Sequence, residues 1–328
     1  MSPGTEVAEV PLRSGFVAVV GRPNVGKSTL VNAMVGSKVS IMSPRPNTTR
    51  RALRGVLNRP GLQAVLVDTP GLHKPRSALG RRMNEHVASA ICDVDMVIAL
   101  VDASAGIGRG DRLVIERCVE GATSTPGMRV VVLANKVDRA ARAAVAGALV
   151  ELQSIVELEA RACAERLGDG YQAVEGRRVA AAASVAERTE YFPVSALTGA
   201  GVEAVVEIVA ASLPEGPAYF PAGMVSDAPE HFVVAELVRE QLLAHTREEI
   251  PHSVACRVTE WEWPRVRVEI LVERDSQKAI VIGREGRVLR AVGEAARAQI
   301  GDGVYLDLHV VVVKHWQDRP DLIERLGY

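Results

Sequence analysis

Residues 21–28 constrain this chain more than any other stretch, because they read Gly-Arg-Pro-Asn-Val-Gly-Lys-Ser. A glycine, four residues, then glycine, lysine and serine is the pattern of a phosphate-binding loop. Its glycines allow backbone conformations closed to residues with a Cβ, so successive N–H groups can surround an anion. An apolar run at 16–20 predicts a strand before the loop, and 27–35 predicts a helix after it. The residues expected to contact nucleotide are Gly21, Arg22, Pro23, Asn24, Val25, Gly26, Lys27 and Ser28.

Residues 39–54, rich in Pro, Arg and Thr, predict a loop that can swing over the bound nucleotide, because Pro44 and Pro46 exclude a regular helix. A threonine there can offer its hydroxyl to Mg²⁺ beside the Ser28 hydroxyl when a terminal phosphate is bound. Thr48 and Thr49 both qualify, and we favour Thr49; a solvated basic loop is the alternative. The switch residues expected here are Asn47, Thr48, Thr49, Arg50 and Arg51.

A second magnesium element is predicted where an apolar strand at 62–67 runs into Asp-Thr-Pro-Gly. Asp68 can hold a magnesium-bound water, and Gly71 can bring its N–H to the γ-phosphate. Thr69, Pro70 and Leu72 complete this part of the expected nucleotide site.

The identity of the nucleotide base is predicted from a strand at 128–133, which runs into Asn-Lys-Val-Asp. Asp138 can accept hydrogen bonds from N1 and N2 of guanine, donors that adenine lacks, while the stem of Lys136 covers the ring. Asn135 braces the loop, and an N–H at Ala196 can donate to the guanine O6. The expected base-binding residues are Asn135, Lys136, Val137, Asp138, Ser195, Ala196 and Leu197.

Strands alternate with helices up to residue 213, which predicts an α/β domain with a mixed, mostly parallel sheet and a nucleotide at the carboxyl ends of its strands. Within it, residues 139–167 read as helix and about 168–190 as a flexible surface insertion. The tail 1–14 is expected to be disordered. Residues 214–229, with four prolines, predict an interdomain linker.

The segment 230–328 has the order helix, strand, strand, helix, Gly-x-x-Gly, helix, strand, which predicts a smaller α+β KH domain of type II that clamps single-stranded RNA. It carries 14 lysines and arginines against 17 aspartates and glutamates, so its net charge is −3. The basic residues that it has are concentrated around the Gly-x-x-Gly loop. The expected RNA-binding residues are Lys278, Gly283, Arg284, Glu285, Gly286, Arg287 and Arg290.

Composition narrows the class of protein to which this chain can belong. A chain of 328 residues with 48% hydrophobic and 24% charged residues suits two soluble domains, and a net charge of −1 excludes a chain-wide basic field for nucleic acid. Four widely spaced cysteines argue against zinc and against a disulfide scaffold. No stretch approaches 18 uncharged apolar residues, so no membrane span is expected.

Taken together, residues 21–32 and 68–80 resemble the Era family of bacterial ribosome-assembly GTPases, within the TrmE-Era-EngA-like group, and residues 235–240, 249–253 and 280–286 are similar to its KH half. The resemblance implies a GTP-switched factor with Mg²⁺ that binds the 3′ end of 16S rRNA during 30S subunit assembly. It further implies a cytoplasmic protein that is partly associated with the inner face of the membrane. We also expect a monomer.

Hydrolysis is expected to be slow, because Leu72 stands where Ras-like proteins orient the attacking water with glutamine. In related GTPases the asparagine matching Asn24 binds K⁺, so a K⁺ site is a further expectation here. Three alternatives remain. The first is a large-subunit factor with tandem nucleotide domains, although the single phosphate loop argues against it. The second is a membrane-recruited signalling switch whose KH-like half is a docking module, and the third is an RNA-binding module with a vestigial nucleotide pocket.

Overall fold

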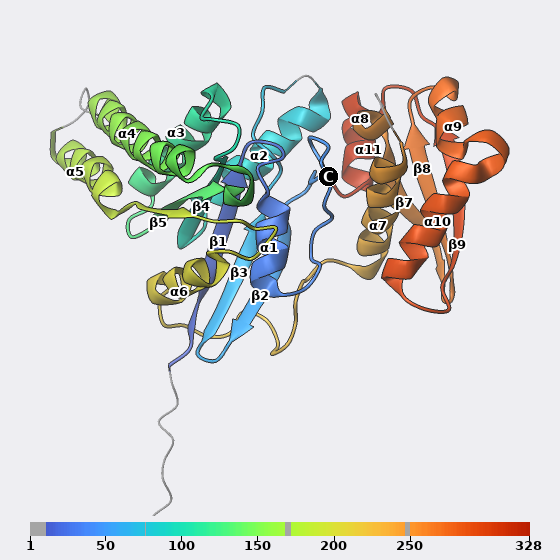
Figure 1. Ribbon diagram of the computed structural model, residues 1–328, viewed down its shortest axis with the longest axis horizontal. Coiled ribbons are helices and arrows are strands. Elements are labelled where there is room, and N and C mark those ends of the chain that lie inside the picture. Colours follow the sequence, from blue (N-terminus) through green and yellow to red (C-terminus); the bar gives the residue numbers. More distant parts are fainter. Residues whose placement is uncertain (1–10, 76, 168–171, 247–249) are drawn as a thin grey trace, which may run out of the picture.

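The buried strand that precedes the phosphate loop lies near the middle of a six-stranded sheet in the computed structural model, which describes residues 11–75, 77–167, 172–246 and 250–328. Figure 1 shows two domains side by side: an N-terminal domain from β1 to α6, and a C-terminal domain from α7 to α11.

The sheet of the N-terminal domain has the strand order β2-β3-β1-β4-β5-β6, in which β2 runs antiparallel to β3 and the other neighbours are parallel. Its central strands are apolar along their length, as expected for a sheet covered on both faces. The strands are β1 (Arg13–Gly21), β2 (Leu53–Arg59), β3 (Leu62–Asp68), β4 (Met96–Asp102), β5 (Arg129–Asn135) and β6 (Glu190–Pro193).

Helices cover both faces of this sheet. One face carries α1 (Lys27–Val35) and α6 (Val202–Ser212), with Leu30 and Val205 fully buried. The other face carries α2 (Ala78–Cys92), α3 (Arg109–Ser124), α4 (Arg142–Leu167) and α5 (Gln172–Arg188). A 3₁₀ turn, η1 (Val137–Arg139), follows β5.

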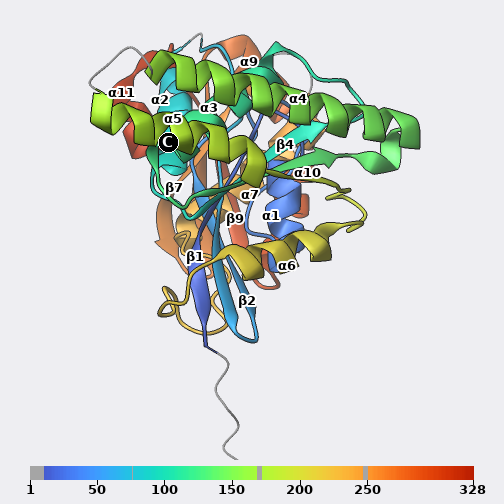
Figure 2. The same cartoon turned by 90° about the vertical axis from the view of Figure 1, so that its left-hand side faces the viewer.

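The predicted flexible insertion at 168–190 is wrong over most of its length, because residues 172–188 form α5. This helix packs against α3 and α4 at the outer side of the domain, and Ala182 and Val185 are buried there (Figure 2). Alanine has the highest helix propensity, so an alanine-rich run favours a helix once residues such as Ala182 and Val185 have a surface to pack against. Residues 168–171 lie outside the described part of the chain.

One further expectation changes at the start of this domain, and the linker at its end makes contacts of its own. The tail predicted over 1–14 is wrong for Arg13 and Ser14, which belong to β1; residues 1–10 lie outside the described part. The segment 214–229 is bound along the sheet edge, where Val56 N donates to Val225 O (2.9 Å) and Gln63 Oε1 accepts from the backbone N–H groups of Tyr219 (2.6 Å) and Phe220 (2.9 Å).

The C-terminal domain has the predicted order of helices and strands around a three-stranded sheet, β7-β8-β9. Strand β8 is antiparallel to β7 and parallel to β9, and α7, α9 and α10 bury their apolar faces against one side. The elements are α7 (Glu230–His245), α8 (Ile250–Ser253), β7 (Ala255–Glu262), β8 (Arg265–Val272), α9 (Asp275–Ile282), η2 (Arg284–Gly286), α10 (Arg287–Ile300), β9 (Tyr305–Val312), η3 (Trp316–Asp318) and α11 (Pro320–Arg325).

The two domains share a hydrophobic cluster. Leu53, Leu79 and Met83 of the N-terminal domain pack with Trp316 and Leu271 of the C-terminal domain. Trp316 is fully buried and donates its indole N–H to Ser253 O (2.8 Å). The segment 313–328 therefore fills the space between the domains (Figure 1). In the described ranges, no helix combines the length and the apolar character that crossing a bilayer requires.

Replacing Val185 by aspartate tests the packing of α5. A charge placed among the apolar side chains of α3, α4 and α5 should lower the free energy of unfolding by about 3 kcal/mol. The matched control is Ala183→Asp, which puts the same residue at an exposed position of the same helix and should change little. Urea unfolding followed by circular dichroism measures both, and equal midpoints for the two variants would contradict this packing.

Candidate functional site

A cavity of about 600 Å³ opens at the carboxyl ends of the parallel strands. The phosphate loop, the switch loop (residues 36–52), Gly71, the segment after β5 and the loop after β6 contribute to its wall. Segments far apart in sequence thus meet where such sheets bind ligands.

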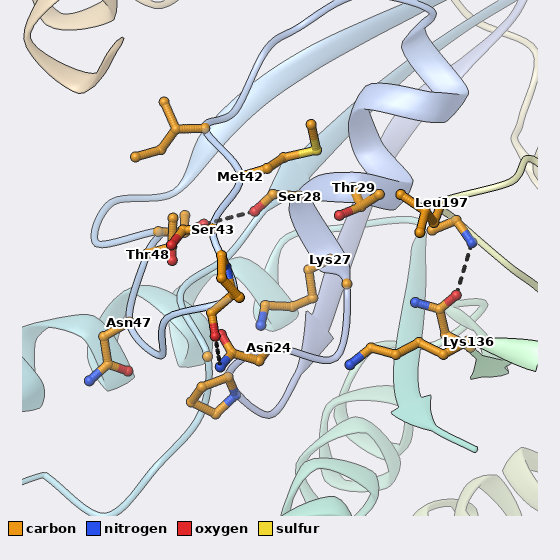
Figure 3. A pocket seen from close by; sticks show the side chains of 18 of the residues that line it. Asn24, Lys27, Ser28, Thr29, Met42, Ser43, Asn47, Thr48, Lys136 and Leu197 are labelled. Carbon is orange, nitrogen blue, oxygen red and sulfur yellow. Dashed lines mark hydrogen bonds between the residues drawn. The ribbon is translucent and has the colours of Figure 1, made fainter. Parts of the chain in front are cut away.

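The phosphate loop wraps around the Lys27 side chain. Lys27 Nζ donates to the backbone oxygens of Gly21 (3.2 Å) and Arg22 (2.9 Å), and Figure 3 shows the amine extending into the cavity. Burial lowers the pKa of Lys27 to about 8, against the opposing effect of Asp68. Gly26 has φ of 102°, and a Cβ there would collide with the Asn135 amide, so this position requires glycine. A partly desolvated amine held by a glycine-containing loop suits a phosphate.

Three oxygen-bearing side chains converge at the start of α1. Ser28 Oγ donates to Asp68 Oδ2 (2.7 Å) and lies 2.9 Å from Thr49 Oγ1, which is 3.3 Å from the same carboxylate oxygen. Burial raises the pKa of Asp68, with the Ser28 hydrogen bond and Lys27 opposing it. Within the described part of the chain, Asp68 Oδ1 is buried without a hydrogen-bond partner. Hydroxyl and carboxylate oxygens in a compact group fit Mg²⁺, a hard cation that prefers oxygen ligands.

The two threonines of the switch loop differ in what they contact. The Thr48 hydroxyl donates to Arg45 O (2.7 Å) within its own loop, whereas Thr49 turns toward Asp68. The geometry therefore brings Thr49, and not Thr48, to the oxygen cluster. On the phosphate-loop side, Asn24 donates to Pro44 O (2.9 Å), and Figure 3 shows its side chain directed at the switch loop.

The segment from Asp68 to Leu72 lies against the phosphate loop. Thr69 is fully buried and donates to Val19 O (2.8 Å), so its hydroxyl is used within the sheet. A Cβ on Gly71 would lie 2.5 Å from Pro23 N, which explains the glycine at this close approach. Leu72 N donates to Gly21 O (3.1 Å), and its side chain packs against the core on the α2 and α3 face.

The opposite end of the cavity is organised by Asn135. Its amide donates to Val25 O (2.7 Å) and accepts from Ala196 N (2.9 Å), so one side chain ties the phosphate loop to the loop after β6. Asp138 accepts from Ser195 Oγ (2.6 Å) at the cavity wall. The N–H of Ala196 is used by Asn135 here, so its contact with guanine O6 stays a prediction.

Lys136 and Leu197 flank this end of the cavity (Figure 3). Lys136 has φ of 65°, and its amine contacts Asp102 Oδ2 at 2.6 Å. Leu197 is 68% exposed. The lysine stem and the leucine are thus available to cover a flat ring between them.

Three arginines predicted from the sequence to belong to the nucleotide site or its switch turn away from the cavity. Arg22 forms a partly buried ion pair with Asp111 at the start of α3 (2.7 Å). Arg50 is buried against the rings of Trp316 and Tyr328 of the C-terminal domain, and the Arg51 guanidinium lies 5.4 Å from the ring centre of Phe232. Guanidinium groups stack on aromatic faces, which accounts for the placement of both switch arginines.

Sequence reasoning missed several residues that shape this site. Asn32 accepts from the N–H groups of Val39 (2.8 Å) and Ser40 (3.0 Å) and so fixes the start of the switch loop. Asp102 and Asp111 hold the side chains of Lys136 and Arg22. Asn32 falls within the resemblance at 21–32, but no local signal marks either aspartate.

The Gly-x-x-Gly loop lies in the other domain, away from this cavity (Figure 1). Gly283, Glu285 and Gly286 have φ of 72°, 55° and 74°, so the chain makes a tight left-handed turn between α9 and α10. Arg284, Arg287 and Arg290 are exposed around it, and Lys278 is half-buried on α9. Arg287 lies 3.6 Å from Glu285.

Comparison with known proteins agrees with both halves of this description. A family model described as 50S ribosome-binding GTPase matches residues 16–136, and one described as KH domain matches 249–317. GTPase Era from Mycobacterium avium strain 104 is 44% identical over 328 residues, covering 96% of this chain and 99% of that protein. GTPase Era from Mycobacterium tuberculosis H37Rv is 42% identical over 327 residues, covering 96% and 98%.

Solved structures agree as well. A point variant of Era from Aquifex aeolicus bound to GDP·AlF4⁻, and Era in complex with MgGDPNP and nucleotides 1506–1542 of 16S ribosomal RNA, each superpose with a TM-score of 0.82 at 32% identity. Each covers 97% of this chain and 99% of its own chain. The fold, the cavity and the full-length likeness lead to one conclusion: this chain belongs to the Era family and is a P-loop GTPase.

Proposed function

We propose that this GTPase holds guanine nucleotide with Mg²⁺ in the cavity between the phosphate loop and the switch loop. Lys27 contacts the β- and γ-phosphates, and Ser28 and Thr49 hold the metal, with Asp68 bound to it through water. Gly71 senses the γ-phosphate. The observation that carries this assignment is the oxygen cluster of Ser28, Thr49 and Asp68 beside the Lys27 amine.

Guanine is selected at the other end of the same cavity. Asp138 accepts from N1 and N2, Asn135 braces the loops and Lys136 covers the ring, while Ala196 offers a backbone N–H. Ser195 supports this role, because its hydroxyl holds the Asp138 carboxylate in one orientation at the cavity wall.

Hydrolysis is slow without help, because Leu72 has no group that can orient the attacking water. No side chain is assigned as general base. Mg²⁺, when bound, neutralises charge on the phosphates. Asn24 is the proposed K⁺ ligand, since its side chain already spans from the phosphate loop to Pro44 of the switch loop.

The C-terminal domain is proposed to bind RNA at the Gly-x-x-Gly loop, with the 3′ end region of 16S rRNA as the target and 30S subunit assembly as the process. Support comes from the exposed arginines of the loop and from the RNA complex of a full-length relative. GTP orders the loops around Thr49 and Gly71 and shifts this domain. We propose a cytoplasmic monomer with peripheral contact at the inner membrane.

Replacing Asp138 by alanine tests guanine recognition. The loss of charged hydrogen bonds to N1 and N2 should weaken GDP binding at least about tenfold, whereas the affinity for ATP should not fall. Asp302→Ala, at an exposed aspartate of the other domain, is the control. Isothermal titration calorimetry measures the affinities for both nucleotides. An unchanged GDP affinity in the Asp138 variant would contradict the assignment of Asp138 to guanine recognition.

The choice of monovalent cation tests the role of Asn24. GTP turnover should be about tenfold faster in KCl than in NaCl of equal concentration, because a cation at this position stabilises charge on the transferring phosphoryl group. The Asn24→Ala variant should lose this difference. Equal turnover of the wild-type protein in both salts, measured by phosphate release, would exclude a K⁺ site.

Replacing Arg284 by alanine tests the RNA surface. The variant should bind an oligonucleotide of the 16S 3′ end about tenfold more weakly, and the slope of log K against log salt should fall by about one. Arg319→Ala, at an exposed arginine paired with Asp321, is the control. Fluorescence anisotropy measures the affinities. If the wild-type protein binds no RNA, the alternative of a docking module is favoured.

A further inference from the structure

The switch loop contacts the C-terminal domain on both sides of Thr49. On one side, the Thr48 carbonyl accepts a hydrogen bond from Arg239 Nη2 of α7. On the other, the Arg50 side chain enters the C-terminal domain and donates to Val254 O (2.8 Å). Thr49 therefore sits between two points at which this loop is fixed to the other domain.

Arg239 is a fully buried arginine held in one orientation. Its Nε and Nη2 contact the two carboxylate oxygens of Glu236 at 2.8 and 2.6 Å, which is a bidentate pair one turn apart on α7. Tyr328 Oη donates to the same carboxylate (3.3 Å). Although burial opposes the charge, Glu236 keeps the pKa of Arg239 above its ordinary value. The guanidinium that reaches Thr48 is thus a charged and rigid donor.

The Arg50 side chain is packed as tightly. Its guanidinium lies 5.3 Å from the ring centre of Trp316 and 5.4 Å from that of Tyr328. Both rings are buried between the domains. Stacking on two desolvated rings anchors this arginine to the C-terminal domain in the arrangement seen here.

Helix α7 also fixes the first part of the switch loop. Glu240, one residue after Arg239, accepts from Lys38 Nζ (2.5 Å) and from Met42 N (2.8 Å). Lys38, Met42 and Thr48 are therefore all held by two neighbouring residues of one helix. A movement of α7 relative to the sheet would pull on the whole loop.

We infer that Arg239 is a positioning residue for the magnesium ligand Thr49, through which the C-terminal domain sets the affinity of the cavity for GTP. This inference rests on the proposed role of Thr49. The Thr48 carbonyl and the Thr49 Cα belong to one planar peptide unit, so fixing the carbonyl constrains where the Thr49 hydroxyl can lie. GDP lacks the γ-phosphate and gains nothing from Thr49, so the effect is confined to GTP.

The coupling is reciprocal. If the contact of Arg239 favours Thr49 at the metal, then GTP with Mg²⁺ must favour the position of α7 seen here by the same factor. Anything that moves α7 away, including a ligand of the C-terminal domain that requires another domain position, then lowers GTP affinity and leaves GDP affinity unchanged.

The experiment uses the full-length chain with Glu236→Gln and Arg239→Met combined, because removing Arg239 alone would leave the buried Glu236 carboxylate without its bidentate guanidinium partner. A fluorescent, non-hydrolysable GTP analogue and GDP are titrated at several Mg²⁺ concentrations. We expect about tenfold weaker binding of the analogue, within the usual range of coupling between sites, and less than about a twofold change for GDP. Circular dichroism checks folding.

Two comparisons make the result specific. Arg54→Ala removes an exposed arginine of β2 that pairs with Asp227 and should change neither affinity. Arg239→Lys keeps the charge but loses the planar guanidinium, so it should weaken binding of the GTP analogue as the double variant does. It replaces the double variant in the experiment if that variant does not fold.

The decisive comparison is a double-mutant cycle with Thr49→Ala. If Arg239 acts through Thr49, its replacement should have no further effect once the Thr49 hydroxyl is gone. Equal weakening of GTP analogue and GDP, or additive effects in the cycle, would overturn the inference. If Thr49→Ala alone changes nothing, the proposed role of Thr49 is lost and this inference with it; if only the Arg239 variants change nothing, the inference alone is overturned.

Discussion

The Asp68 carboxylate has no exposed surface, and the rest of the cavity depends on how its charge is stabilised. Isolated burial of a carboxylate is costly, so the fold must bring compensating groups to it. It does so from two segments: Lys27 and Ser28 at the start of α1, and Thr49 in the switch loop. One oxygen of Asp68 still has no hydrogen-bond partner among the described residues, and a free carboxylate oxygen is a ligand that a hard cation prefers.

The same constraint governs the interface between the domains. Arg50 and Arg239 are both buried, and with Glu236 and Tyr328 they form a polar cluster surrounded by apolar side chains. Burial and the neighbouring charge of Arg239 lower the pKa of Arg50, so the two guanidinium groups are tolerated only because carboxylate, carbonyl and ring partners surround them. Such a buried polar cluster gives little net stability, but its hydrogen bonds favour one position of the switch loop relative to α7.

The sequence predicts what is local and misses what is distant. The phosphate loop and the strands beside it follow from residues that are neighbours in the chain. The patterns at 21–28 and 68–71 are therefore sufficient to predict these local structures. Arg50 is predicted as a switch residue beside the nucleotide, yet its ring partners, Trp316 and Tyr328, belong to the last segment of the chain. No periodicity or spacing in the sequence can indicate such a contact.

Helix α5 could not be predicted for a different reason. Only its burial against α3 and α4 distinguishes a packed helix from a loose alanine-rich segment, and burial is a property of the assembled domain. The choice between Thr48 and Thr49 likewise required the turn at Arg45, which uses the Thr48 hydroxyl and leaves Thr49 facing Asp68.

The placement of α7 explains how a net acidic domain can serve as a partner for the nucleotide cavity. This helix is buried along most of its length: its apolar residues pack into the C-terminal core, while Arg239 and Glu240 contact the switch loop. It also packs along α10, the helix that begins directly after the Gly-x-x-Gly loop. A displacement of α10 therefore cannot occur without strain at α7, because closely packed interiors transmit strain. The acidic residues of α7 that face the switch loop are used within the protein, whereas Arg284, Arg287 and Arg290 around the Gly-x-x-Gly loop are exposed to solvent.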